Sequence, residues 1–332
     1  MTANPILAEQ TRGTTVENIH RGAYVICDAE GKVIASAGDI ERPVFPRSAI
    51  KSMQALAMVT SGAIDSLALT DRELALACAS HHGEDVHVEG VAAFLDHIGR
   101  APADLECGAH PPTNGAARKT LMEQGAAPTV LHNNCSGKHS GMLSVAKALG
   151  IDSAGYVERD HPVQAAVRKA IEQVIGMELS EDFCGRDGCS IPTYAAPLKG
   201  FAQGFARMAT GIGLPDDLAR AARRIFDAAT SHPLLVAGSG HLDTLVMEAF
   251  GGRLMQKVGA EGVQCGAIRD KGWGYALKCD DGNIPASQAM VAGLLLRHAD
   301  PDAAQRAVLE RFAHQTLTNV RGFEVGEMRS AI

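Results

Sequence analysis

The two ends of the chain carry the hydrophobic pattern of β-strands, and the long middle carries that of helices. Residues 23–29 (AYVICDA) and 32–38 (KVIASAG) are short apolar runs, and the dipeptide EG between them is typical of a hairpin turn. Strand-like runs return late in the chain, punctuated by glycines and the tripeptide DDG, at 253–260, 263–269 and 273–282.

Between these ends, apolar residues recur at the three- and four-residue spacing of an amphipathic helix. The segment 70–80 begins with Thr70 and has Glu73 three residues later, which is the signature of a capping box. A glycine-rich entry into a helix lies at 136–150. Other helices are predicted at 48–62, 85–99, 116–125, 161–176, 218–229, 286–298 and 301–314.

This order of elements predicts an α+β fold. Strict alternation of strands and helices is absent, so a doubly wound parallel sheet is disfavoured. We expect one domain over residues 1–332, with an antiparallel sheet built from about 20–40 and 250–328. The helical region, about 48–235, then packs beside this sheet and leaves a cleft between the two.

Composition narrows the class of partner and the compartment. The 332 residues include 31 Lys plus Arg and 38 Asp plus Glu, for a net charge of −7, which argues against nucleic acid or an anionic membrane as the partner. No apolar run reaches about 18 residues, and no signal-peptide pattern opens the chain. The eight cysteines are dispersed without a Cys-x-x-Cys pair, so we expect free thiols in a reducing, cytoplasmic setting.

Ser48 and Lys51 raise the first chemical hypothesis, since residues three apart share one face of a helix. A serine hydroxyl becomes a nucleophile when a base takes its proton, and lysine is such a base when it is neutral. Burial or a second cation lowers a lysine pKa toward that state. The S-x-x-K pattern works this way in some serine hydrolases, but it is common by chance, and a helix cap with a surface lysine is the plainer interpretation.

Two further segments offer partners for this pair. Residues 257–259 (KVG) lie in a predicted strand and resemble the K-T-G triplet that such hydrolases place beside the S-x-x-K helix, with Val258 in place of threonine. Ser80 ends a helix and enters a loop rich in histidine and acidic residues, 81–87. H-E-x-x-H spacing is absent there, so a loop that brings Ser80 to a cleft is favoured over a metal site. A capping serine followed by histidines with structural partners is an equally good interpretation.

The segment 132–142 (HNNCSGKHSGM) looks at first like a phosphate-binding loop, but His132 and His139 stand where that motif needs Gly and Ser or Thr. Its helix start could instead present N–H groups to an oxyanion or a carboxylate. Asp187, in a tight polar turn, could bind an α-amino group. Cys135 and Cys189 could be soft metal ligands, although buried free thiols are the usual state.

Taken together, these segments resemble the L-asparaginase II family, the rhizobial-type or class 3 asparaginases. The resemblance rests on RSAIKSMQA, CASHHGED, NNCSGKHSGM, GRDGCSIP and KVGAEG, in this order, and extends from about residue 10 to about 325. It implies hydrolysis of L-asparagine to L-aspartate and ammonia, a fold similar to serine β-lactamases and glutaminases, and a homodimer.

The resemblance also implies roles for individual residues. Two Ser–Lys pairs carry over by position, Ser48 with Lys51 and Ser80 with Lys257. A zinc site carries over to Cys135, Lys138 and Cys189, and Arg47, Asp187 and His139 are expected beside the substrate. Some relatives have a cysteine near GSGHLDTLVM, where this chain has Asp243 and no thiol.

We therefore expect an acyl-enzyme mechanism in which Ser48 attacks and Lys51 is the general base, while Ser80 and Lys257 relay a proton. Ser80 as the nucleophile stays open. So do three other functions: a penicillin-recognising enzyme of the same fold, a glutaminase, whose substrate differs by one methylene, and an amino-acid-binding protein without activity.

Overall fold

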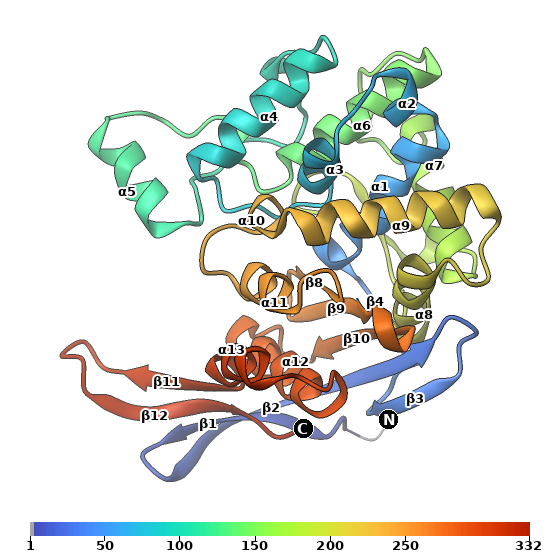
Figure 1. Ribbon diagram of the computed structural model, residues 1–332. Coiled ribbons are helices and arrows are strands. Elements are labelled where there is room, and N and C mark those ends of the chain that lie inside the picture. Colours follow the sequence, from blue (N-terminus) through green and yellow to red (C-terminus); the bar gives the residue numbers. More distant parts are fainter. Residues whose placement is uncertain (1–2) are drawn as a thin grey trace.

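The computed structural model describes residues 3–332 and confirms the α+β arrangement (Figure 1). Within these residues the main sheet has eight strands in the order β11-β12-β1-β2-β10-β9-β8, and β3 pairs with β2; every pairing is antiparallel. The strands are β1 Ile6–Arg12, β2 Thr15–Asp28, β3 Val33–Ala37, β8 Leu254–Gly259, β9 Val263–Ile268, β10 Trp273–Cys279, β11 His314–Thr318 and β12 Glu324–Ser330.

The two ends of the chain meet in this sheet, as the strand pattern predicted. β1 lies between β2 and β12, and Ala8 pairs with Ser330. β1 lies outside the predicted sheet segments, and β11 and β12 were predicted only as part of the range 250–328 and not as separate strands. Their sequences are mostly polar and only partly buried, so they lack the apolar runs that reveal the central strands.

The central strands are buried on both faces, which explains their continuous apolar runs. On β2, Val25 and Cys27 point into the core on one face, while Tyr24 and Ile26 point into a second core on the other face. Helices α12 (Ile284–His298) and α13 (Ala303–Ala313) cover this second face. Helix α8 (Leu198–Thr210), which was not predicted, packs on the first.

The helical block lies beyond the first face and begins with a short 3₁₀ helix, η1 (Arg47–Ile50), that leads into α1 (Figure 1). Its helices are α1 Lys51–Thr60, α2 Ala63–Ser66, α3 Asp71–Ala77, α4 Asp85–His97, α5 Gly115–Glu123, α6 Ser136–Leu149, α7 Pro162–Ile175, α9 Asp216–Ser231, α10 Pro233–Val236 and α11 Leu242–Phe250. The capping box at the start of α3 forms as predicted, since Glu73 N donates to Thr70 and Thr70 N donates to Glu73.

Short elements complete the chain. Two small sheets pair β4 (Pro43–Val44) with β7 (Ala196–Pro197), and β5 (Cys184–Arg186) with β6 (Pro192–Tyr194). The remaining 3₁₀ helices are η2 Pro102–Asp104, η3 Val130–His132, η4 Glu181–Phe183 and η5 Arg269–Lys271. All eight cysteines are free thiols. Across residues 3–332, no helix combines the length and the apolar character needed to cross a bilayer.

Candidate active site

Ser80 and Lys257 form a hydrogen-bonded pair where the helical block meets the sheet. Lys257 comes from β8, an edge strand of the sheet, and its Nζ lies 3.0 Å from Ser80 Oγ. Ser80 follows α3, and its N–H donates to the carbonyl oxygen of Val236 at 2.9 Å, which fixes the loop. Both side chains are buried. The fold thus joins a serine and a lysine that are 177 positions apart in sequence.

Asp243 is the counter-charge of Lys257. Its Oδ2 lies 3.7 Å from Lys257 Nζ and accepts the N–H of Val258 at 2.9 Å. Both charged side chains are fully buried, so each needs the other to offset its loss of hydration. Asp243 also stands in the first turn of α11, where the helix dipole favours a negative charge.

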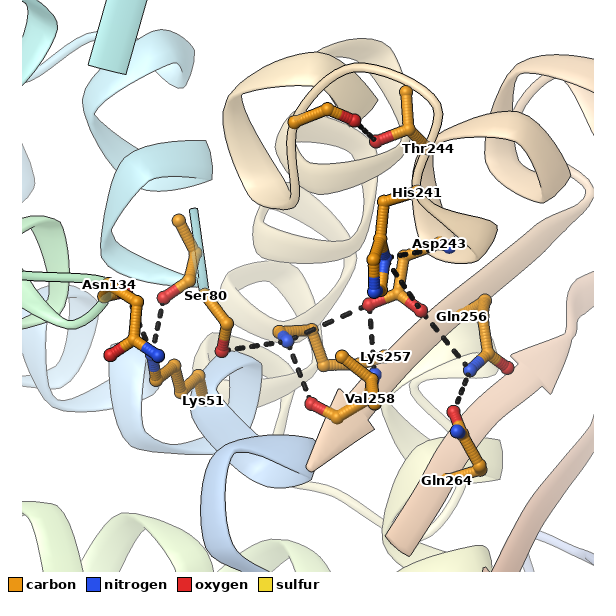
Figure 2. Close-up of polar contacts among 12 residues, drawn as sticks. Lys51, Ser80, Asn134, His241, Asp243, Thr244, Gln256, Lys257, Val258 and Gln264 are labelled. Atoms are coloured by element: carbon orange, nitrogen blue, oxygen red, sulfur yellow. Dashed lines mark hydrogen bonds and ion pairs between the residues drawn. The ribbon is translucent and has the colours of Figure 1, made fainter. Parts of the chain in front are cut away.

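A network of polar side chains fixes the Asp243 carboxylate. Figure 2 shows contacts that run from Ser80 through Lys257 and Asp243 to Gln256 and Gln264. Gln256 Nε2 lies 3.4 Å from Asp243 Oδ1 and 2.7 Å from Gln264 Oε1. These side chains are buried and hydrogen-bonded, so the carboxylate has little freedom to leave Lys257.

Lys51 lies on the other side of Ser80. Its Nζ donates to the carbonyl oxygen of Ala79, the residue before Ser80, and to that of Asn134 at 3.2 Å (Figure 2). The Cys135 thiol raises the pKa of this amine, against the lowering by burial. Among the described residues no hydrogen bond joins its amine to the Ser48 hydroxyl, so the structure brings Lys51 to the Ser80 loop rather than into direct contact with Ser48.

Ser48 lies on η1, so the predicted single helix over 48–62 is a 3₁₀ turn followed by α1. The turn packs against β8 because Gly259 has no side chain: a Cβ there would lie 2.6 Å from the carbonyl oxygen of Pro46. Arg47 has a left-handed backbone with φ of 51°, which is costly for a residue with a Cβ. Strain of this kind next to Ser48 is typical of a functional turn.

Both lysines are driven toward the neutral state. Burial lowers the pKa of Lys257 to about 8, against the opposing effect of Asp243 and with the help of the Lys51 charge. Burial also lowers the pKa of Lys51, with Lys138 adding to the effect, although Cys135 and Cys189 oppose it. A neutral amine can accept a serine proton, so each lysine has the electrostatic character of a general base.

Cys135, Lys138 and Cys189 form a buried cluster beside Lys51. Lys138 Nζ lies 2.9 Å from Cys189 Sγ. A hydrogen bond from Cys189 holds the pKa of Cys135 well below its ordinary value against the effect of burial, and Lys138 and Lys51 reinforce this. For Lys138, burial favours the neutral amine, but the two thiols and Asp187 outweigh it and raise its pKa. The structure therefore brings the three predicted zinc ligands together, with the lysine held as an ammonium.

Arg47 and Asp187 form an ion pair next to this cluster. Arg47 Nε lies 2.6 Å from Asp187 Oδ1, and Gly188 N–H donates to the same oxygen. Burial would raise the pKa of Asp187, but Lys138, Arg47 and this N–H hold it below its usual value. Arg47 also lines an open pocket of about 380 Å³ between β4 and the β5–β6 hairpin.

The histidines have structural partners. His81 Nε2 lies 2.8 Å from Ser136 Oγ, and His87 Nε2 lies 2.8 Å from the carbonyl oxygen of Leu234. His139 is fully buried, with Nδ1 2.7 Å from the Tyr156 hydroxyl. Burial lowers the pKa of all three. The loop after Ser80 is therefore built from neutral, mostly satisfied imidazoles.

The glycines of the 132–142 segment serve packing rather than phosphate binding. A Cβ on Gly137 would collide with the carbonyl oxygen of Leu76 on α3, and one on Gly141 would crowd Met58 on α1. Close approach of the three helices brings Lys51, Ser80 and Cys135 together.

Sequence reasoning missed how Asp243, Gln256 and Asn134 serve the site. Asp243 was noticed only as a departure from relatives. Its one local signal is its place in the first turn of a helix, after the capping residue His241. The contacts of Asp243 with Lys257 and Gln256 depend on how α11 docks on β8, which no local spacing encodes.

Comparison with solved structures gives distant likenesses. A β-lactamase from Mycobacterium bovis aligns with a TM-score of 0.43 at 14% identity, over 84% of this chain and 95% of that one. Simvastatin synthase from Aspergillus terreus aligns with a TM-score of 0.34 at 11% identity, over 88% of this chain and 90% of that one. Comparison with curated proteins gives no significant match.

Comparison with protein families is specific. The family described as L-asparaginase II matches residues 8–330, nearly the whole chain. The matched region contains both Ser–Lys pairs, Asp187 and the cysteine cluster. The chain therefore belongs to the L-asparaginase II family.

Proposed function

We propose that this protein is an L-asparagine amidohydrolase that releases L-aspartate and ammonia through a serine-bound acyl intermediate. The observation that carries the proposal is the group formed by Ser80, Lys257 and Lys51, two buried lysines of lowered pKa on either side of one serine. Membership of the L-asparaginase II family supports the hydrolase class and the amide substrate.

Ser48 is assigned as the nucleophile and Lys51 as its general base. Ser48 is partly exposed, whereas Ser80 is buried against Lys257. A neutral Lys51 amine can still donate its two N–H groups to the carbonyls of Ala79 and Asn134, and its lone pair is then free for the Ser48 proton. Attack on the side-chain amide carbon forms the acyl bond and breaks the bond to nitrogen.

Ser80 and Lys257 are assigned to proton relay. Ammonia needs a proton as it leaves, and the bonded hydroxyl and amine provide a path for one next to Lys51. Water then attacks the acyl carbon, and the same groups take its proton before aspartate departs. If Ser80 is the nucleophile, Lys257 is its base and Ser48 joins the relay.

Arg47 and Asp187 are assigned to the α-carboxylate and α-amino group of asparagine. They carry opposite charges 2.6 Å apart, which complements the two charges of an amino acid, and Arg47 lines the open pocket. His139 is completely buried, so its part is to support α6 through Tyr156 rather than to contact substrate directly.

Zinc belongs to the proposal as a bound ion beside this site. The two thiols match the sulfur ligands that zinc prefers, and the low pKa of Cys135 favours a thiolate. Lys138 matches less well, since an ammonium must lose its proton before its nitrogen can bind a metal. Cys135 and Cys189 would hold the ion, which would order the loop that supports Lys51.

The assembly and the compartment are proposed as a homodimer in the cytoplasm. Exposed apolar side chains on the β1–β2 and β11–β12 hairpins support self-association. Free thiols throughout the described chain are consistent with a reducing compartment.

The deciding experiment measures ammonia release from L-asparagine and from L-glutamine by the native chain and by Ser48→Ala, Ser80→Ala and Ser52→Ala. Ser52 is the matched control, because it lies on α1 with a buried hydroxyl that has no hydrogen-bond partner in the described structure. We expect asparagine turnover that falls at least about 100-fold in Ser48→Ala and stays near native in Ser52→Ala.

Other outcomes are equally informative. Turnover that survives in Ser48→Ala but disappears in Ser80→Ala would exchange the two serine roles. Glutamine as the better substrate would make the enzyme a glutaminase, since one methylene in a pocket is worth only about 1–3 kcal/mol. If neither amide released ammonia although asparagine bound, the amidohydrolase proposal would fail and a binding protein would remain.

A further inference from the structure

A second cluster of metal-ligating side chains lies on the opposite face of the sheet from Ser80 and Lys257. It contains His20 on β2, Cys279 at the end of β10, and Asp281 in the turn before α12. Cys279 pairs with Gly22 of β2. His20 comes two residues before Gly22 in this strand, so the two lie on the same face of the sheet. On that face, Tyr24 of β2 belongs to the core beneath α12, far in the fold from the Cys135 cluster.

The three ligand atoms converge. One nitrogen of His20, the sulfur of Cys279 and one carboxylate oxygen of Asp281 all lie within 4.8 Å of one another. In this arrangement His20 Nδ1 lies 2.6 Å from Asp281 Oδ2, and Cys279 Sγ lies 2.9 Å from Asp281 Oδ1. Within residues 3–332 this is the one group of three or more His, Cys, Asp or Glu side chains with such convergence.

Apart from the N–H of Asn283, which donates to Asp281 Oδ1, the hydrogen bonds of these ligand atoms within the described residues are to one another. Asp280 is already bound by Asn4 and Arg42, so its carboxylate does not compete. His20 is buried, and among the described residues its Nε2 has no hydrogen-bond partner. Without an ion, Nδ1 donates its proton to Asp281, because a carboxylate only accepts. A bound ion would take the place of that proton, which can move to the unpartnered Nε2, and Nδ1 then offers its lone pair. Asp281 is half-exposed, which opens the cluster to water and to an entering ion.

We propose that His20, Cys279 and Asp281 bind a divalent ion of the zinc class. A neutral imidazole, a thiolate and a carboxylate supply nitrogen, sulfur and oxygen ligands of the kinds zinc takes, and water can fill the remaining position at the exposed side. Binding releases the Cys279 thiol proton to solvent, after which the two negative ligands balance the two positive charges of the ion.

An ion here would tie the middle of β2 to the end of β10 and to the start of α12. These elements are joined already by the backbone contact between Asp280 N–H and the carbonyl oxygen of Arg21. The bound ion would stabilise the folded state, because the unfolded chain does not hold the three ligands together. Its part is structural and independent of the proposed amidase.

The test uses Co²⁺ as a spectroscopic probe in a Cys135→Ser/Cys189→Ser background, which removes the sulfur ligands of the other cluster. We expect about one equivalent of Co²⁺ to bind with a thiolate-to-cobalt charge-transfer band. The band should disappear in Cys279→Ser and in His20→Ala. It should persist in Cys184→Ser, a control on a half-buried thiol outside both clusters.

A second measurement covers the case in which the background variant does not fold. In the native chain, equilibrium dialysis against Zn²⁺ should give one equivalent more than in His20→Ala, and added Zn²⁺ should raise the Tm of the native chain more than that of the variant. Equal metal content and equal Tm shifts, or a cobalt band that survives Cys279→Ser, would overturn the proposed site. Neither readout depends on amidase activity.

Discussion

At the scale of single residues, the site depends on how two lysines lose their charge. Lys257 and Lys51 are both fully buried, and a buried ammonium without a partner would be costly. Asp243 and the carbonyls of Ala79 and Asn134 offset part of that cost. What remains lowers the pKa of both amines, so each is more readily neutral and able to accept a proton.

The pH dependence of activity should report Lys257. Its pKa is lowered to about 8, so the amine is protonated below that pH and neutral above it. The relay needs the neutral amine, and kcat/KM for asparagine should therefore rise as the pH increases through about 8. A pH–rate profile of the native chain measures this, and a rate that fell with rising pH over the same interval would contradict the relay.

Asp243→Asn tests the counter-charge. The carboxylate opposes the lowering of the Lys257 pKa, so its removal should move the ascending limb of the profile to lower pH. It also leaves a buried cation unpaired whenever Lys257 is protonated, so thermal stability should decrease most at acidic pH. Asp65→Asn, at an exposed carboxylate, is the control and should leave both unchanged. If the ascending limb of the pH–rate profile did not shift in Asp243→Asn, Asp243 would have no effect on the pKa of Lys257.

At the scale of elements, two local features position Ser80 and Ser48. The capping box starts α3, and the helix ends at Ala77, three residues before Ser80. Gly259 lets η1, which carries Ser48, lie against β8, which carries Lys257. The serines and lysines belong to different elements, so the distances between them depend on how these elements pack together.

Thr70→Ala should cost about 1 kcal/mol of stability, because the N–H of Glu73 loses its side-chain acceptor. Chemical denaturation of the variant and of native protein measures the difference. Thr60→Ala is the control, since its hydroxyl bonds back to the carbonyl oxygen of Leu56 inside a helix and alanine is a better helix former. Equal losses in the two variants would mean that the capping box contributes nothing measurable.

Gly259→Ala should impair catalysis more than stability. The added methyl would meet the carbonyl oxygen of Pro46 and the N–H of Ala49, so η1 must move away from β8. We expect kcat to fall at least about 10-fold while much of the fold survives, since a small displacement of a catalytic group is costly. Gly115→Ala, where nothing lies within 4 Å, is the matched control. If Gly259→Ala kept the native kcat, Ser48 would not take part in the chemical step.

At the scale of the whole molecule, the two ends of the chain lie next to each other in the main sheet. β1 and β12, from opposite ends, pair in one sheet, and α12 and α13 cover one face while α8 and the helical block cover the other (Figure 1). Two cores therefore share the central strands. The candidate amidase site lies on the side of the helical block, and the His20 cluster lies on the other.

The proposed homodimer can be tested on the hairpins. Ile19 is 46% exposed on β2, in the hairpin it forms with β1. If this surface is the interface, Ile19→Asp should shift sedimentation velocity from dimer toward monomer, because burying the new charge is unfavourable. Ile212→Asp, 55% exposed in the α8–α9 connection, should leave the dimer intact. A native chain that sediments as a monomer would remove the homodimer from the proposal.

The sequence by itself determined the class of fold and the central strands. Apolar runs such as AYVICDA mark strands buried on both faces, and the order of strands, helices and strands favours one antiparallel sheet. It also determined helix starts such as Thr70, because capping is a contact between residues three apart. The family motifs indicated the residues of the candidate site, whose catalytic roles stay proposals.

Only the tertiary structure decided which groups meet. Lys257 contacts Ser80 and Asp243 because β8, α11 and the end of α3 dock together, and Lys51 bonds to the loop of Ser80 although spacing had pointed it to Ser48. His20 and Cys279 are 259 positions apart and meet only through the pairing of β2 with β10. The physical reason is the same in each case: local pattern encodes which face of an element is buried, whereas partners across a core depend on how whole elements pack.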